Sequence, residues 1–277
     1  MNEIKDLKEE EHGKLILALS MLLLIFLVIA SFSGIFIEAT YARNTPSFAA
    51  QGIGQDIVNL FIVTPLLLIS SILYYKGNIK GKFVWAGLIV YILYSYVIYG
   101  FAQPFNFLFL VYCAVLGLAF YAFIYFLLTT YHEPIKDYYQ SEFPSKAVIL
   151  FNLIVALLFY FVWLSEVVPA LIANRIPQSV IENGVNTNPV HVLDLSIVLP
   201  ALLITAFWLF KDHKNGYFMA PVLLIFLLIM ALAIIAMIIA MEFLGVATDF
   251  SLTVIFGVIT GVDAIITAMV FKSLKSR

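Results

Sequence analysis

His191 and Asp194 are the residues with the clearest capacity for chemistry, and they lie three positions apart at the start of an apolar segment. Residues three apart share one face of a helix, so the imidazole and the carboxylate can contact one ligand. Trp163 and Glu166 have the same spacing near the end of the preceding apolar segment. Carboxylates and an imidazole are suited to proton transfer, to cation binding and to holding a metal ion.

Further polar residues interrupt two apolar segments in the first half of the chain. Gln55, Asp56 and Asn59 are separated by only a few positions and share roughly one helical face. In the next segment a polar residue recurs at every fourth position: Tyr91, Ser95, Tyr99 and Gln103. Polar side chains are costly in hydrocarbon and face protein or water there, so these positions predict a buried polar surface.

The elements that must position these residues are membrane-spanning helices. Hydrophobic residues make up 63% of the chain and charged residues 12%, whereas soluble domains are about half apolar and about a quarter charged. No water-soluble core could bury this much apolar surface, so we expect lipid to be the solvent. The net charge of −2 gives no indication of a nucleic-acid partner. The single cysteine, Cys113, excludes a disulfide framework, and we expect it to pack as a small buried residue.

Eight apolar runs have about the length of 20 residues that a spanning helix needs. They cover residues 15–38, 55–75, 83–103, 106–130, 147–172, 191–210, 218–243 and 250–271. The sequence therefore predicts an all-α integral membrane protein with about eight transmembrane helices. With this count, lysines fall mainly on the side of the two termini, whereas Arg43 and Arg175 fall on the other side. Because positively charged loops stay in the cytoplasm, we expect a multi-pass cell-membrane protein with both termini cytoplasmic.

A constant offset of 135 residues aligns parts of the two halves of the chain. At this offset three less common residues coincide: Pro65 with Pro200, Lys76 with Lys211, and Gly81 with Gly216. Four helices per half is an even number, so the pattern predicts a parallel duplication of two four-helix halves. The expected organisation is a cytoplasmic segment, a first membrane half, a cytoplasmic loop, a second membrane half and a tail, at residues 1–14, 15–130, 131–146, 147–271 and 272–277.

The predicted orientation brings most of these polar groups to the extracytoplasmic half of the membrane, around one pocket that opens outward. The candidate ligand-binding residues are Gln55, Asp56, Asn59, Tyr99, Gln103, Trp163, Glu166, Asn188, His191 and Asp194. Asp56 and Asn188 have an alternative role as caps of a helix N-terminus. Glu166 lies near a helix C-terminus, where an acid opposes the helix dipole, so capping of that helix does not explain it.

Asp263 lies deeper, in the last apolar segment. It is a candidate proton-relay residue, and the alternative is a hydrogen bond to a neighbouring helix. Gly257 and Gly261 precede it with the small-xxx-small spacing that favours close helix packing.

Three functions fit this pattern. The first is a carrier or binding protein for a small molecule or ion, with a polar site within the membrane. The second is an extracytoplasmic membrane enzyme, such as a metal-dependent hydrolase of a lipid-linked substrate, and its metal ligands would be Asp56, Glu166, His191 and Asp194. The third is a non-catalytic sensor or assembly subunit. No motif identifies a cofactor, and a bis-histidine haem is not expected because His12, His132 and His213 lie on the opposite side of the membrane from His191.

Overall fold

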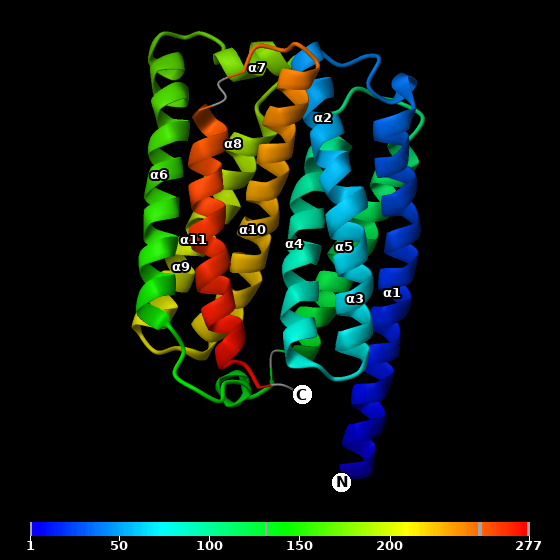
Figure 1. Cartoon of the computed structure of the whole chain (residues 1–277), viewed down its shortest axis with the longest axis vertical. Coiled ribbons are helices and arrows are strands. Elements are labelled where there is room, and N and C mark those ends of the chain that lie inside the picture. Colours follow the sequence, from blue (N-terminus) through cyan, green and yellow to red (C-terminus); the bar gives the residue numbers. More distant parts are fainter. Residues whose placement is uncertain (1, 131, 249–250, 276–277) are drawn as a thin grey trace.

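The chain forms a bundle of long helices, shown in Figure 1. The computed structural model describes residues 2–130, 132–248 and 251–275. Within these ranges, eight helices are long and apolar enough to cross a membrane, which confirms the predicted number and the all-α class. The protein is therefore a multi-pass membrane protein.

The spanning helices follow one another with short connections. The first half contains α1 (Asn2–Phe36), the broken helix α2–η2–α3 (Pro46–Val58, Asn59–Val63, Thr64–Tyr75), α4 (Ile79–Phe101) and α5 (Phe109–Thr130). The second half contains α6 (Ser145–Ile172), the broken helix α8–η4–α9 (Pro189–Leu193, Asp194–Val198, Leu199–Phe210), α10 (Lys214–Phe243) and α11 (Ser251–Ser273). Three short helices lie in the loops: η1 (Glu38–Thr40), η3 (Ile135–Tyr138) and α7 (Gln178–Asn183).

The second spanning helix begins at Pro46, well before the expected residue 55. Thr45 caps it by accepting a hydrogen bond from the backbone N–H of Phe48 at 3.3 Å, and proline is well suited to the first helical position. The first turns contain serine, glutamine and glycine, and this lowers the apolar content that marks a spanning segment. Asp56 is therefore in mid-helix, and the prediction that it could be an N-cap was wrong.

Both broken helices contain a π turn immediately before a proline. η2 ends one residue before the Thr64–Pro65 pair, and η4 ends one residue before Leu199–Pro200. Proline has no backbone N–H and its ring crowds the preceding turn, so a regular α-helix cannot continue through it unchanged. A π turn accommodates the break by adding one residue to the turn, and such turns are frequent at functional sites.

The two broken helices and the turns after them correspond at the offset of 135 residues. η2 and η4 begin at Asn59 and Asp194. Each broken helix is followed by a tight turn that contains one residue in the left-handed conformation. This residue is Gly77 after α3, at φ 77°, and Asp212 after α9, at φ 53°. α4 and α10 then begin at equivalent positions. The local backbone therefore repeats along the whole stretch where the sequence offset was found.

The two termini lie at the same end of the bundle, which we call the terminal end, and the opposite end is the distal end (Figure 1). α4 and α10 lie between helices α1–α3 and α5 on one side and helices α6, α8, α9 and α11 on the other. The buried apolar residues form two clusters, one mainly from the first half with α10, and one from α6, α9, α10 and α11.

Cys113 is exposed on the outside of the bundle, so the prediction that it packs as a small buried residue was wrong.

Close helix approaches occur at glycines other than the predicted pair. A Cβ atom at Gly54 of α2 would lie 2.5 Å from the Cα of Met237 in α10, and Gly87 of α4 also lies directly against α10. A Cβ at Gly257 or Gly261 would meet no described atom within 4 Å. The small-xxx-small motif of α11 therefore does not mediate packing within this chain, because these glycines are on its exposed face.

Replacement of Ser20 by alanine is expected to lower the free energy of unfolding by about 1–3 kcal/mol. The indole N–H of the fully buried Trp85 donates to the Ser20 hydroxyl at 2.8 Å, and alanine would leave this donor without its acceptor. Chemical unfolding in detergent measures the change. Ser165→Ala is the control because Ser165 is exposed and bonds only within its own helix. Equal stabilities of the two variants would contradict the prediction.

Candidate functional site

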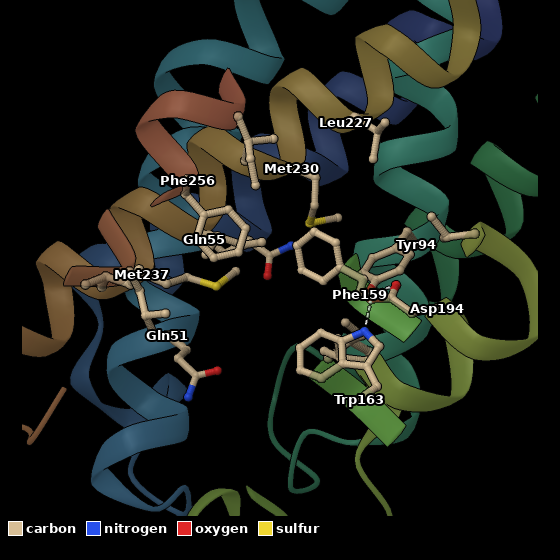
Figure 2. A pocket seen from close by; sticks show the side chains of 18 of the residues that line it. Gln51, Gln55, Tyr94, Phe159, Trp163, Asp194, Leu227, Met230, Met237 and Phe256 are labelled. Atoms are coloured by element: carbon tan, nitrogen blue, oxygen red, sulfur yellow. Dashed lines mark hydrogen bonds between the residues drawn. The ribbon is translucent and has the colours of Figure 1, made fainter. Parts of the chain in front are cut away.

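A cavity of about 360 Å³ lies between the two halves of the bundle and extends inward from the distal end. This volume is in the range of small-molecule sites, which are about 300–1,000 Å³. Its walls are mainly apolar and aromatic side chains of α6, α10 and α11, including Phe159, Phe226, Met230, Met237 and Phe256. Its polar lining residues are Gln51, Gln55, Tyr94, Trp163, Asn183, Asn188, Asp194 and Thr248. Figure 2 shows Asp194 and Trp163 on one side of the cavity, and Gln51 and Gln55 of α2 on the other.

Asp194 is the acidic residue of this cavity and the first residue of the π turn η4. The Tyr94 hydroxyl donates to Asp194 Oδ1 at 3.0 Å, and Trp163 Nε1 donates to Oδ2 at 2.8 Å. An indole N–H can only donate, so these contacts suit an ionised carboxylate. Within the described chain, no lysine, arginine or histidine lies within ion-pair distance of Asp194. The cavity therefore presents a fixed carboxylate without a protein cation.

Trp163→Phe is expected to lower the free energy of unfolding by about 1.5–3 kcal/mol, the usual contribution of a hydrogen bond to a charged group. Phenylalanine keeps most of the ring but removes the donor to Asp194 Oδ2. Thermal unfolding of the purified protein measures the loss. Trp208→Phe is the matched control, because the Trp208 indole N–H makes no hydrogen bond to the described part of the chain. If both variants are equally stable, the hydrogen bond from Trp163 to Asp194 does not contribute to the free energy of unfolding.

His191 and Glu166 lie beside this carboxylate and contact each other. The His191 ring packs against the Trp163 ring with centroids 4.7 Å apart, and its Nε2 is 3.5 Å from Glu166 Oε2. Glu166 Oε1 accepts a hydrogen bond from the backbone N–H of Ser179 at 2.9 Å. Glu166 therefore supports the first turn of α7 rather than capping its own helix, a role that sequence spacing could not indicate.

Asn188 has the capping role that the sequence suggested, and it also lines the cavity. Its side-chain oxygen accepts from the backbone N–H of Val190 at 3.0 Å, at the start of α8. Its amide nitrogen donates to the Ser179 hydroxyl at 3.1 Å. At the distal end, Gln51 donates to Asn183 at 3.0 Å, so an amide pair joins α2 to α7 above the cavity.

Asp56 belongs to a separate buried cluster and not to this cavity. Its carboxylate accepts hydrogen bonds from the hydroxyls of Tyr41 and Tyr99, the latter at 3.0 Å. Burial, and then the neighbouring carboxylate, raise the pKa of Tyr41 well above its ordinary value, so Tyr41 is the donor in its pair. A Cβ at Gly34 would lie only 1.7 Å from Asp56 Oδ2, so α1 closes tightly over the acid.

The expectation of one shared hollow was therefore only partly right. Of the ten candidates, those that line the cavity are Gln55, Trp163, Asn188 and Asp194. His191 and Glu166 support its edge, whereas Asp56 and Tyr99 form the second cluster with Asn59 beside them. Gln103 lies past the end of α4 and accepts a hydrogen bond from Asn44 at 2.5 Å in the distal loops.

The four residues of the expected metal site do not form one group. Among the residues that the structure describes, no three His, Cys, Asp or Glu side chains lie close enough to hold one metal ion. Asp56 contacts tyrosines of the first half, Asp194 contacts Tyr94 and Trp163, and Glu166 turns toward α7. The metal prediction failed because spacing along two helices does not fix which helix faces which.

Asp263 is fully buried on α11, one turn from the cavity-lining Ile259. Its Oδ1 accepts from Thr267 of the same helix at 3.0 Å, and its Oδ2 has no hydrogen-bond partner in the described chain. The alternative of a hydrogen bond to a neighbouring helix thus gains no support, and the proton-relay role stays a prediction.

Three residues with clear roles in these sites were not predicted from the sequence: Tyr41, Gln51 and Tyr94. Tyr94 is one position away from the polar stripe of α4, so the four-residue periodicity excluded it. Gln51 lies in the part of α2 that was expected to be a loop. Tyr41 contacts Asp56 from the loop after α1, and no periodic pattern in the sequence predicts such a contact.

The chain was compared with family models, with curated proteins and with solved structures. None of these three comparisons gave a match.

Proposed function

We propose that this protein binds a small amphipathic molecule with a cationic group in the cavity and carries it across the membrane. The observation that supports this most directly is the position of Asp194, a carboxylate on the wall of an apolar cavity without a protein cation among the described residues. A charged group in such surroundings is costly unless a partner compensates it. A positively charged ligand would supply that partner.

The aromatic walls favour the same class of ligand. Tyr94, Phe159 and Trp163 surround the approach to Asp194. Aromatic faces attract quaternary and other organic cations, and this attraction is worth about 0.5–2 kcal/mol for each well-placed ring. The remaining apolar lining, such as Phe256 and Met237, would contact the hydrocarbon part of the molecule. The amides of Gln51 and Gln55 add hydrogen-bonding groups on the opposite wall.

The broken helices support transport over simple storage. Asp194 opens a π turn within a spanning helix, and discontinuous helices near a substrate site are a recurrent feature of transporters. In this proposal the distal end faces outward and the lysine-rich terminal end faces the cytoplasm, as the positive-inside rule predicts. The cavity would then receive its ligand from the extracytoplasmic side.

The proposal includes a parallel duplication of the halves at residues 15–130 and 147–271. The recurrence of a π turn, a left-handed residue and a following helix start at one offset supports it. The halves would differ in one respect: Asp194 of the second half faces the open cavity, whereas tyrosines of the first half pack around Asp56. Loss of symmetry of this kind would leave one carboxylate free for the ligand while the other stays enclosed.

Uptake into proteoliposomes tests the proposal. We expect uptake of benzyltrimethylammonium or choline to exceed that of protein-free liposomes, and 3,3-dimethylbutanol, the neutral isostere of choline, to be ineffective as a competitor. Ligand-dependent thermal shift of the purified protein measures binding separately. Binding without flux would overturn transport and leave the sensor function. Absence of both for a broad panel of organic cations would overturn the proposal.

A further inference from the structure

The second buried cluster, around Asp56, has features of an ion site that the cavity does not explain. Asp56 is 1% exposed and lies in mid-helix, enclosed by α1, α4 and the loop that carries Tyr41. Within the described ranges, no lysine, arginine or histidine is within ion-pair distance of it. Two tyrosine hydroxyls donate to it, but neutral donors do not compensate its charge.

Several buried polar atoms near Asp56 also make no hydrogen bond in the described chain. Ser31 and Asn59 lie next to the carboxylate, but the contacts of the Ser31 hydroxyl and of the Asn59 amide with it do not have the geometry of a hydrogen bond. The same holds for three hydroxyls in the same region, those of Tyr91, Ser95 and Tyr96. Native proteins pair nearly all buried polar atoms, so a group of unpaired ones calls for an additional partner.

We propose that Asp56, Asn59 and Ser31 form a binding site for one sodium ion. The Asp56 carboxylate, the Asn59 amide oxygen and the Ser31 hydroxyl would coordinate the ion. The ion would neutralise the single negative charge of Asp56. A proton on Asp56 would neutralise the charge too, but its single O–H can donate to only one of the Asn59 and Ser31 oxygens. A divalent ion would leave one excess positive charge, because Asp56 is the acid of this cluster.

The packing around the site favours a small ion. A Cβ at Gly34 would overlap the carboxylate, and a Cβ at Gly52 would lie 2.7 Å from the Tyr41 ring, so the surrounding helices leave little free space. Sodium is smaller than potassium and fits a closely packed oxygen site better. Asn59 also begins the π turn η2, and broken helices recurrently coordinate sodium or protons in transporters.

Sodium binding to the full-length protein in detergent tests this inference directly, and the measurement does not depend on ligand binding in the cavity. Equilibrium binding of radioactive sodium is expected to saturate at one ion per chain, with weak competition by potassium. Asp56→Asn, which keeps the size of the side chain, is expected to abolish binding. Asn59→Ala and Ser31→Ala are expected to weaken it at least tenfold, and they keep the carboxylate if Asp56→Asn fails to fold.

Asn152→Ala is the matched control for Asn59→Ala, since Asn152 is an equally buried amide of the other half, also without a hydrogen-bond partner in the described chain. This variant is expected to bind sodium as the unmodified protein does. Three results would each overturn the proposal: no saturable sodium binding by the folded protein, which would indicate bound water only; unchanged binding in Asp56→Asn; or unchanged binding in both Asn59→Ala and Ser31→Ala. Loss of organic-cation uptake with intact sodium binding would instead count against the proposed function alone.

Discussion

Asp194→Asn is expected to weaken binding of a cationic ligand in the cavity about 100-fold, which corresponds to about 2.7 kcal/mol. The substitution keeps the size of the side chain and removes its charge. Truncation of one partner in a buried charge pair costs about 2–5 kcal/mol or more, because the other charge is left uncompensated. Asparagine also presents an N–H₂ group where Trp163 Nε1 or the Tyr94 hydroxyl now donates. Isothermal titration with benzyltrimethylammonium measures the affinity.

Two comparisons show whether the charge of Asp194 is the cause. Asp263→Asn neutralises a buried acid of the same half that does not line the cavity, and its affinity is expected to stay unchanged. A neutral isostere of the ligand is expected to bind the unmodified protein and Asp194→Asn equally weakly. Equal affinities of the unmodified protein and Asp194→Asn for the cation would remove Asp194 from the binding site.

The number of spanning helices could be predicted because it depends on a strong local signal. A helix in lipid needs about 20 apolar residues regardless of its neighbours. The start of the second helix was missed because Gln51, Gly52 and Gly54 lower the apolar content of its first turns. These residues are tolerated because they face protein: Gln51 bonds to α7, and the two glycines contact Tyr41 and α10.

The division of the polar residues between two sites could not be predicted from spacing. Adjacent helical residues point about 100° apart, so Gln55 faces the cavity while Asp56 faces α1. Each π turn adds a residue and shifts the face that later residues present. The offset of 135 residues did place Asn59 and Asp194 at equivalent positions, but equivalence within two halves does not bring two residues into contact.

The spacing of glycines also led to a wrong prediction of helix packing, for a clear physical reason. Gly257 and Gly261 satisfy the small-xxx-small pattern, but a pattern on one helix does not specify whether that face meets another helix. Gly54 is not part of such a motif, yet it lies directly against the backbone of α10. The difference between these glycines provides a stringent test of the packing between the halves.

Gly54→Ala is expected to lower the free energy of unfolding by about 2–3 kcal/mol, at the upper end of the usual cost of overpacking. The added Cβ would lie 2.5 Å from Met237 Cα and 2.6 Å from the Ala236 backbone oxygen. Because these are backbone atoms, no rotamer change can relieve the clash and α2 must move away from α10. Met237 also lines the cavity, so this movement is expected to weaken ligand binding as well. Denaturant titration in detergent measures the stability.

Gly261→Ala is the control, since its added Cβ would meet no described atom within 4 Å. Alanine is a better helix former than glycine by about 1 kcal/mol, so this variant is expected to be as stable as the unmodified protein or slightly more stable. The same chemical change thus has opposite predicted signs at the two positions. A destabilised Gly261→Ala would indicate that α11 packs against a second chain through this face. A Gly54→Ala variant of unchanged stability would mean that α2 and α10 do not pack as closely as described, and the wall of the cavity that carries Gln51 and Gln55 would have to be placed differently.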